Sequence, residues 1–453
     1  MANFAKSQVP QFSVEVYQNE YLPEGGREVN AIVTVTSTGG GTSGGAPLRA
    51  GTAEPVDRAG AVPGAAVVLM VDCSGSMDYP PAKMRNAREA TAAAIDTLRD
   101  GVEFAVVAGT HRAVEVYPGG GRLATADAAH RAQAKEALRS LTASGGTAIG
   151  TWLSLTDTLL TTARSPIRHG ILLTDGRNEH ESPADLRATL DRLAGRFTCD
   201  ARGVGTDWEV KEVTGIASAL LGTADIVADP AQLAADFTGM MEKAMGKGVA
   251  DVALRLWTPV GVEIQFVKQV APTVEDLTAR RTDAAPRIGD YPTGSWGDES
   301  RDYHLCVRVP EAGIGREMLA ARASLIIPDA MGAGAPEVLS QGLIRAVWTD
   351  DLAATTGINP QVAHYTGQAE LAQAIQLGLD ARKLGDFDGA TARLGRAVQL
   401  AAASGNEDTA KLLSKVVDVV DAATGTVRLK AKVAEADEMT LETRSTKTVR
   451  VKR

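Results

Sequence analysis

Hydrophobic and polar residues follow different patterns in successive parts of the chain. Residues 11–38 alternate, as in FSVEVY and VNAIVTVTS, and a period of two is typical of half-buried strands. Residues 64–246 instead combine continuous apolar runs, such as AVVLMVD and GILLTD, with segments of helical periodicity. Strands that alternate with helices predict an α/β domain with a doubly wound, mostly parallel sheet and helices on both faces.

The alternating pattern returns after this α/β segment. Between residues 249 and 352, runs such as VEIQFVKQV, YHLCVRVP and ARASLIIP are separated by turn residues, which predicts an antiparallel β-sandwich. A lone hairpin is only marginally stable, so we expect residues 1–38 to supply the first strands of that sandwich. The fold class expected is therefore an α/β domain inserted in an antiparallel β-sandwich, with a separate N-terminal hairpin as the alternative.

Three further segments complete the expected organisation. Residues 39–63 are rich in Gly, Ala and Pro and read as a linker. Residues 360–424 have a helical pattern and are expected to form a C-terminal α-helical hairpin region, which resembles a single tetratricopeptide-type unit. Residues 425–453 end with five Lys or Arg and one Glu among the last twelve positions, and we expect a flexible basic tail.

The composition of the chain indicates its location in the cell and the kinds of partner that we expect. The three cysteines lie far apart along the 453 residues, which favours free thiols and a cytoplasmic location: Cys73, Cys199 and Cys306. No apolar run approaches the roughly 18 residues that span a bilayer, and we expect no signal peptide and no membrane partner. The formal charge of −9 argues against a nucleic-acid partner.

Oxygen-bearing side chains follow the ends of two predicted buried strands. Asp72-Cys73-Ser74-Gly75-Ser76 follows the first strand and Thr174-Asp175-Gly176 the second, while Ser144-Gly145-Gly146-Thr147 opens a helix. Ligands of open parallel sheets bind at the carboxyl ends of the strands. The sequence therefore predicts one divalent-cation site made by five residues: Asp72, Ser74, Ser76, Thr147 and Asp175.

The ligand chemistry of this predicted site favours Mg²⁺, with Mn²⁺ or Ca²⁺ as alternatives. All donors are hard oxygen atoms, which suit these ions. Because three of them are neutral hydroxyls, the ion would keep excess positive charge, and an Asp or Glu of a protein partner could complete its shell. The simpler interpretation, that the hydroxyls only cap turns and helices, stays open.

These segments resemble the metal-ion-dependent adhesion site (MIDAS) of von Willebrand factor A (VWA) domains, in particular bacterial intracellular VWA proteins. The resemblance implies direct ligation by Ser74, Ser76 and Thr147, with the two Asp residues binding directly or through water. It implies a metal-dependent protein–protein interaction module that acts as a scaffold or adaptor and self-assembles in some settings. The alternatives are a purely structural metal, or an accessory subunit of an ATPase or of a kinase–phosphatase signalling or stress-resistance system.

The residues that surround this predicted site are weaker candidates. Residues that follow the two strand ends are expected on the rim that a partner would meet: Asp78, Tyr79, Arg177, Glu179 and His180. The chain has no P-loop pattern, and we expect no enzyme, although Mg²⁺-dependent hydrolysis with Glu179 or His180 as base is a further alternative.

The tail carries a separate hypothesis about regulation. Three threonines in the segment that we expect to be flexible are candidate phosphorylation sites: Thr443, Thr446 and Thr448. A phosphate there would let a phosphopeptide-binding domain dock on the tail.

Overall fold

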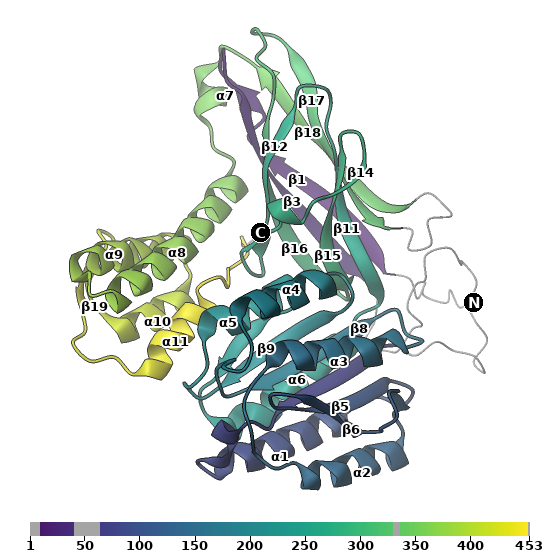
Figure 1. Ribbon diagram of the computed structural model, residues 1–453. Helices are drawn as coiled ribbons and strands as arrows, with labels where there is room; N and C mark the ends of the chain where they lie inside the picture. Colours follow the sequence, from purple (N-terminus) through teal and green to yellow (C-terminus); the bar gives the residue numbers. More distant parts are fainter. Residues whose placement is uncertain (1–9, 40–63, 329–335, 452–453) are drawn as a thin grey trace, which may run out of the picture. The chain divides into compact units, whose positions relative to one another are not determined.

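The computed structural model describes residues 10–39, 64–328 and 336–451. The chain divides into two compact units (Figure 1). The first contains Thr38–Asp251 and Gly294–Asp298, and the second contains Gln11–Ser37, Val252–Thr293 and Glu299–Arg453. The first unit is therefore inserted between strands of the second. The linker that we expected at 39–63 lies, apart from Gly39, outside the described residues.

The first unit is built on a mostly parallel sheet with the strand order β10-β9-β8-β4-β5-β6, and β7 pairs with β5. The pairs within β10-β9-β8-β4-β5 are parallel, whereas β6 and β7 run antiparallel to β5. The strands are β4 (Ala66–Asp72), β5 (Glu103–Gly109), β6 (Ala113–Tyr117), β7 (Ala124–Thr125), β8 (Arg168–Thr174), β9 (Thr198–Val204) and β10 (Ala224–Val227).

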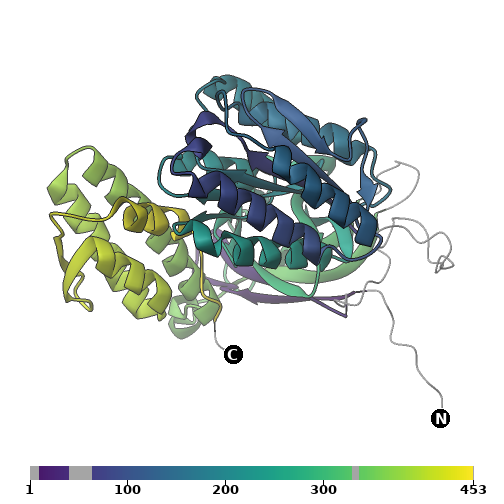
Figure 2. The same ribbon diagram turned by 90° about the horizontal axis from the view of Figure 1, so that it is seen from below.

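Helices cover both faces of this sheet (Figures 1 and 2). They are α1 (Ala82–Thr97), α2 (Ala128–Ala137), α3 (Ile149–Thr161), α4 (Pro183–Leu193), α5 (Val210–Ala219) and α6 (Leu233–Met245), with short 3₁₀ turns at Gly75–Asp78, Leu138–Ser140 and Pro230–Gln232. The predicted doubly wound α/β fold is confirmed.

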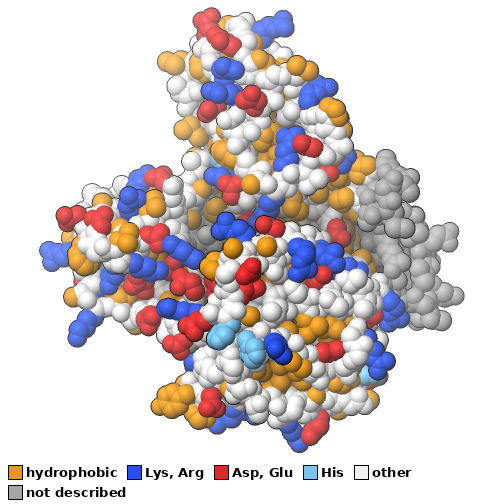
Figure 3. All heavy atoms as spheres, in the orientation of Figure 1, with side chains coloured by type: hydrophobic (Ala, Val, Ile, Leu, Met, Phe, Trp, Pro, Cys, Tyr) orange, Lys and Arg blue, Asp and Glu red, His pale blue; other side chains and the backbone are white. Residues whose placement is uncertain are grey.

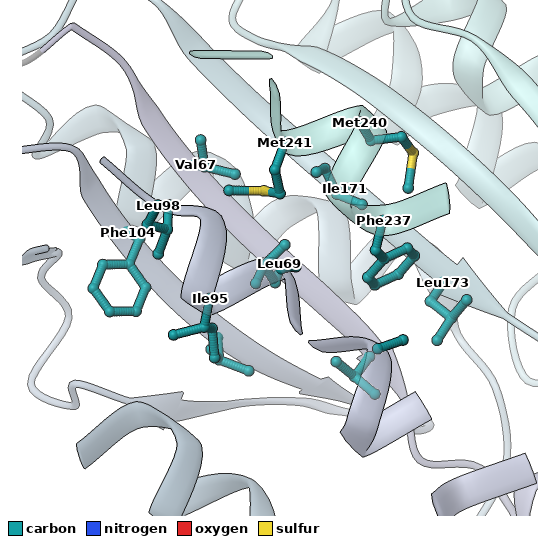
Figure 4. Packing of buried hydrophobic residues seen from close by; sticks show 14 of the residues in the cluster. Val67, Leu69, Ile95, Leu98, Phe104, Ile171, Leu173, Phe237, Met240 and Met241 are labelled. Atoms are coloured by element: carbon teal, nitrogen blue, oxygen red, sulfur yellow. The ribbon is translucent and has the colours of Figure 1, made fainter. Parts of the chain in front are cut away.

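The core on one face of the sheet forms because β4 is buried at every position. Its alternate residues Val67 and Leu69 pack with Ile95 of α1 and with Phe237 and Met241 of α6 (Figure 4). Burying side chains of this size stabilises the fold by roughly 1.5–3 kcal/mol each. This packing places β4, and the residues that follow its carboxyl end, against a buried core.

The second unit contains two mostly antiparallel sheets, in one of which β2 pairs in parallel with β18, and their packing forms a β-sandwich. One sheet has the order β1-β3-β16-β12-β13 and the other β14-β15-β11-β17-β18-β2. The strands are β1 (Gln11–Gln18), β2 (Tyr21–Leu22), β3 (Glu28–Thr38), β11 (Val249–Trp257), β12 (Glu263–Ala271), β13 (Glu275–Asp276), β14 (Thr282–Ala285), β15 (Ile288–Trp296), β16 (Glu299–Arg308), β17 (Glu317–Ile327) and β18 (Glu337–Trp348).

The N-terminal strands belong to this sandwich and do not form a separate hairpin. β3 pairs along its length with β16, from Glu28 opposite Arg308 to Ser37 opposite Glu299. The two sheets approach closely where Gly342 of β18 leaves room for Val16 of β1. A 3₁₀ turn at Thr278–Arg280 completes the sandwich.

The C-terminal region contains helices and one small hairpin of strands. Its elements are α7 (Leu352–Thr356), α8 (Pro360–Lys383), α9 (Phe387–Ser404), α10 (Glu407–Val416), β19 (Val417–Asp421), β20 (Thr426–Leu429) and α11 (Glu435–Arg444). α8 and α9 pack through Gly378, whose missing side chain leaves room for Leu394. The β19–β20 hairpin was not expected, because its strands are short and mostly exposed.

The expectation of a flexible tail is wrong for residues 435–451. Residues Glu435–Arg444 form α11, and the chain after it pairs with the sandwich, because Thr448 N donates to Pro272 O at 2.9 Å and Val274 N donates to Thr446 O at 2.8 Å. Thr443 is buried, so its hydroxyl is not accessible for phosphorylation in this conformation. Thr446 and Thr448 are half-buried.

The helices within residues 10–39, 64–328 and 336–451 were compared with what a membrane-spanning helix requires. Within them, no helix combines the length and the apolar character that crossing a bilayer requires.

Candidate metal-binding site

Two carboxylates meet at the switch point of the parallel sheet. From β4 the chain passes to β5 on one side and later enters β8 on the other side, so strand order reverses at the border between β4 and β8. Asp72 is the last residue of β4, and Asp175 directly follows β8. Both side chains are buried. This is the crevice where open α/β sheets bind ligands.

Hydrogen bonds hold the Asp72 carboxylate in one orientation. Ser74 N donates to Asp72 Oδ1 at 2.8 Å, and Thr174 Oγ1 donates to Asp72 Oδ2 at 2.7 Å. Burial raises the pKa of Asp72 to about 6, hydrogen bonds from Ser74 oppose this rise, and the negative charge of Asp175 adds to it. A cation at this point would favour the ionised form of both carboxylates.

Three hydroxyl groups converge beside these carboxylates. Ser76 Oγ donates to Asp175 Oδ1 at 2.7 Å and lies 3.0 Å from Ser74 Oγ. A Cβ atom placed on Gly176 would lie 2.9 Å from Ser76 Oγ, 3.7 Å from Thr147 Oγ1 and 3.8 Å from Ser74 Oγ. All three hydroxyl oxygens therefore surround one small space, which the absence of a side chain at Gly176 keeps open.

The loop that carries Thr147 is bound to the loop after β4 by backbone hydrogen bonds. Ser144 N donates to Cys73 O at 2.8 Å, and Gly75 N donates to Gly145 O at 2.9 Å. Gly145 has a φ of +76°, a conformation that favours glycine. These bonds bring Thr147 to the site although it is 71 positions beyond Ser76 (147 − 76).

Side chains from the loop after β8 hold the start of α3 next to Thr147. Asn178 Oδ1 accepts from Ile149 N at 2.8 Å, and Glu181 Oε2 accepts from Gly150 N at 2.9 Å. Asn178 also donates to Glu181 at 2.9 Å. These two residues perform the capping role that Ala148, at the N-cap position, cannot perform. Sequence reasoning missed them because the contact joins segments about 30 residues apart.

A lysine that no sequence pattern indicated also contacts the site. Lys83 Nζ lies 2.7 Å from Asp175 Oδ2 and 3.0 Å from Asp207 Oδ2. It also donates to Ser76 O at 3.4 Å. Burial lowers the pKa of Lys83, but the hydrogen bonds to the two carboxylates outweigh burial and raise it overall.

The predicted rim residues all have exposed side chains: Asp78, Tyr79, Arg177, Glu179 and His180. Tyr79 is 81% exposed, which is high for an aromatic residue. His180 is anchored to the site loop, because His180 N donates to Thr147 O at 2.9 Å and Thr147 N donates to His180 Nδ1 at 3.3 Å. Its ring centroid lies 6.5 Å from that of His111, a neighbour that the sequence did not single out. Figure 3 shows histidine side chains side by side on the surface of this unit.

The donor set fits a hard divalent cation. It contains two carboxylates and three hydroxyls, and within the part of the chain that the structure describes no three His, Cys, Asp or Glu side chains form a metal-binding group. Soft metals that require thiolate or imidazole ligands therefore fit this site poorly. Five oxygen-bearing side chains from three loops suit Mg²⁺, which prefers oxygen ligands and keeps bound water.

Comparisons with known proteins agree with this fold. Residues 65–226 match the model of the von Willebrand factor type A domain, and residues 399–445 match the von Willebrand factor type A C-terminal domain. The chain is 53% identical to a solved structure described as von Willebrand factor type A from Catenulispora acidiphila, with 99% of each chain covered and a TM-score of 0.89.

A second solved structure shares the fold at low identity. It is the ArnB paralog VWA2 from Sulfolobus acidocaldarius, 14% identical, with 96% of this chain and 98% of that chain covered and a TM-score of 0.55. No curated protein matches the chain at a significant level. The identity to the Catenulispora protein over the full length shows that this chain belongs to the von Willebrand factor type A family.

Proposed function

We propose that this protein is a metal-dependent protein–protein interaction module. In this proposal Asp72, Ser74, Ser76, Thr147 and Asp175 hold a Mg²⁺ ion directly or through water, and an acidic side chain of the partner completes the shell. The convergence of three hydroxyl oxygens around Gly176, beside two buried carboxylates, carries the proposal. Capping of turns alone does not require three hydroxyls from two distant loops to surround one point.

The charge of the site explains why the partner group would be acidic. The two carboxylates balance the formal charge of a divalent ion. The three hydroxyl ligands are neutral and add no further negative charge. A carboxylate that reaches the ion through the accessible side at Ser76 would replace water and gain a strong electrostatic contact. Mn²⁺ has similar ligand preferences, whereas Ca²⁺ takes more ligands, about 6–8, at longer distances.

The exposed rim supplies contact area around the ion. Tyr79 and His180 are exposed next to the site loops, and aromatic residues are enriched among the side chains that dominate binding energy. Tyr79 follows the loop after β4 and His180 lies in the loop after β8, so a partner at the ion could also contact these side chains. We include self-association among the interactions that such a surface could make.

We propose that the site acts by binding and not by catalysis. The nearest thiol, Cys73, is buried, and burial together with the charge of Asp72 raises its pKa to about 12. A thiol of this kind is protonated and a poor nucleophile at neutral pH. The three free and buried cysteines also agree with a cytoplasmic location, which is part of this proposal.

An affinity pulldown from the native cells tests the proposal. The wild-type protein is used with Mg²⁺ and with EDTA, Asp72→Ala is used with Mg²⁺, and Asp191→Ala, at an exposed position of α4, is the matched control. We expect the same partner with wild type and Asp191→Ala in Mg²⁺, and its loss with EDTA and with Asp72→Ala. Recovery of the same partners in every arm would contradict a metal-dependent interface.

The identity of the captured protein distinguishes an accessory subunit from a self-associating module. An ATPase, or a kinase or phosphatase, would identify an accessory subunit of that system. Capture of a second, differently tagged copy of this chain only in Mg²⁺ would identify self-association.

A further inference from the structure

The positively charged ammonium group of Lys83 contacts one carboxylate of the proposed metal site. It lies 2.7 Å from Asp175 Oδ2, and the lysine side chain is 10% exposed while that of Asp175 is fully buried. Its second carboxylate partner, Asp207, lies at the protein surface with a side chain that is 67% exposed. Lys83 therefore bridges one buried and one exposed carboxylate.

The local structure does not by itself favour a lysine at this position. Lys83 is the second residue of α1, and the first turn of that helix contains no acidic residue. The N-terminus of a helix carries a positive partial charge, so a lysine there is unfavourable. A residue that breaks a local preference is expected where function compensates for it, and the contact with Asp175 is the compensating interaction.

The charges of the site give this contact a consequence for metal binding. Asp72 and Asp175 place two negative groups in a buried crevice, and a nearby positive charge stabilises them. A metal ion that binds the Asp175 carboxylate must compete with the ammonium that already contacts it. Lys83 can release Asp175 and remain paired, because Asp207 is within 3.0 Å.

We propose that Lys83 is a built-in competitor of the metal ion, which neutralises Asp175 in the metal-free protein and keeps only Asp207 when the metal binds. This inference rests on the proposed metal site. It assigns Lys83 a role in setting the metal concentration at which the module becomes competent to bind its partner. Asp207 has the complementary role, because it retains the ammonium outside the site.

Calorimetric titration of Mg²⁺ into four purified proteins tests the role of Lys83. They are wild type, Lys83→Met, Asp207→Asn and the double variant. Loss of the ion pair between Lys83 and Asp175, which opposes the metal, should tighten Mg²⁺ binding to Lys83→Met by about tenfold. Asp207→Asn should weaken binding severalfold, since the ammonium then has only Asp175. In the Lys83→Met background the Asp207→Asn substitution should change the affinity by much less.

Two controls separate this mechanism from general electrostatics. Arg85→Met removes the same charge from an exposed position two residues further along α1, and it should leave the Mg²⁺ affinity nearly unchanged. Repeating the titrations at high salt screens exposed charges but not the buried contact. If the changes in Mg²⁺ binding free energy caused by Lys83→Met and by Asp207→Asn add in the double variant, the two effects are independent and arise from long-range charge. That result overturns the role of Lys83 as a competitor.

The outcomes distinguish failure of this inference from failure of the metal site. Wild type that binds Mg²⁺, with Lys83→Met binding no more tightly, overturns the role of Lys83 alone. Absence of Mg²⁺ binding in wild type and in Lys83→Met overturns the metal site itself. Circular dichroism verifies folding of each variant, and Lys83→Gln replaces Lys83→Met if the apolar side chain prevents folding.

Discussion

Thr174 Oγ1 donates a hydrogen bond of 2.7 Å to Asp72 Oδ2, and this bond joins the carboxyl ends of β8 and β4. Both residues are fully buried. Thr174 is not among the five proposed metal ligands, but it fixes the orientation of one of them. A ligand carboxylate that is held in this way loses little freedom when the metal binds.

Thr174→Val keeps the shape of the side chain and removes this hydrogen bond. We expect Mg²⁺ affinity to fall by about 10–100-fold, the usual effect of losing a partner that orients a metal ligand. Isothermal titration calorimetry measures the change, with Thr158→Val on the exposed face of α3 as the control. Equal affinities in Thr174→Val and wild type would show that the bond does not support the site.

Gly176→Ala tests whether the space among the three hydroxyls is the binding space. The added Cβ would lie 2.9 Å from Ser76 Oγ, so that hydroxyl must shift. We expect strong loss of Mg²⁺ binding with a thermal unfolding midpoint close to wild type. Gly215→Ala is the control, because a Cβ there meets no atom within 4 Å. Wild-type affinity in Gly176→Ala would place the ion elsewhere.

The buried His304 of β16 should make the free energy of unfolding of the sandwich depend on pH. Burial, with a smaller effect from the charge of Lys268, lowers the pKa of His304 to about 4. The unfolded chain, with a His pKa near 6.5, therefore binds more protons between about pH 4 and 6.5. The contribution of His304 is complete above pH 6.5 and is lost as the pH falls through this window, by about 3 kcal/mol.

Urea unfolding of wild type and His304→Gln at several pH values between 7 and 4 measures this effect. The free energy of unfolding of wild type should fall relative to that of the variant across the window. Parallel curves for the two proteins would refute the assignment to His304.

The contacts of Arg450 with Asp302 should stabilise the second unit. Its guanidinium donates to both oxygens of the buried Asp302, at 2.8 and 3.0 Å, and Asp302 also accepts from Thr34 and Tyr365. Arg450→Met should lower the free energy of unfolding by about 1–3 kcal/mol, toward the lower limit because the arginine side chain is 41% exposed.

Chemical denaturation compares Arg450→Met with Arg393→Met, which removes an exposed arginine of α9. Arg450→Lys should recover only part of the loss, because lysine cannot bind a carboxylate in the same bidentate way. An unfolding curve of Arg450→Met that matches the control would show that the tail is not held by this contact.

The features that the sequence predicted well are those determined by local pattern. β4 is a continuous apolar run that ends in Asp72, and β8 contains the apolar run GILL before Thr174, so the burial of these segments followed from local pattern. The return of alternating strands after the α/β segment predicted the inserted arrangement in the same way.

The features that it did not predict depend on contacts between distant segments. Lys83 reaches Asp207 across 124 positions, and Arg450 reaches Asp302 across 148. The tail contains few apolar residues, so composition indicated disorder, whereas polar contacts with buried Asp302 hold its end in place. No local pattern contains this information.

Calorimetric titration of Mg²⁺ into wild type, Thr147→Ala and Asp175→Asn tests the central claim most directly. The five-residue site predicts saturable binding of one ion per chain to wild type, much weaker binding to Thr147→Ala and none measurable to Asp175→Asn. Thr158→Val, with an exposed substitution on α3, should bind like wild type. Wild type that binds no divalent cation, or variants that all bind as wild type does, would contradict the site.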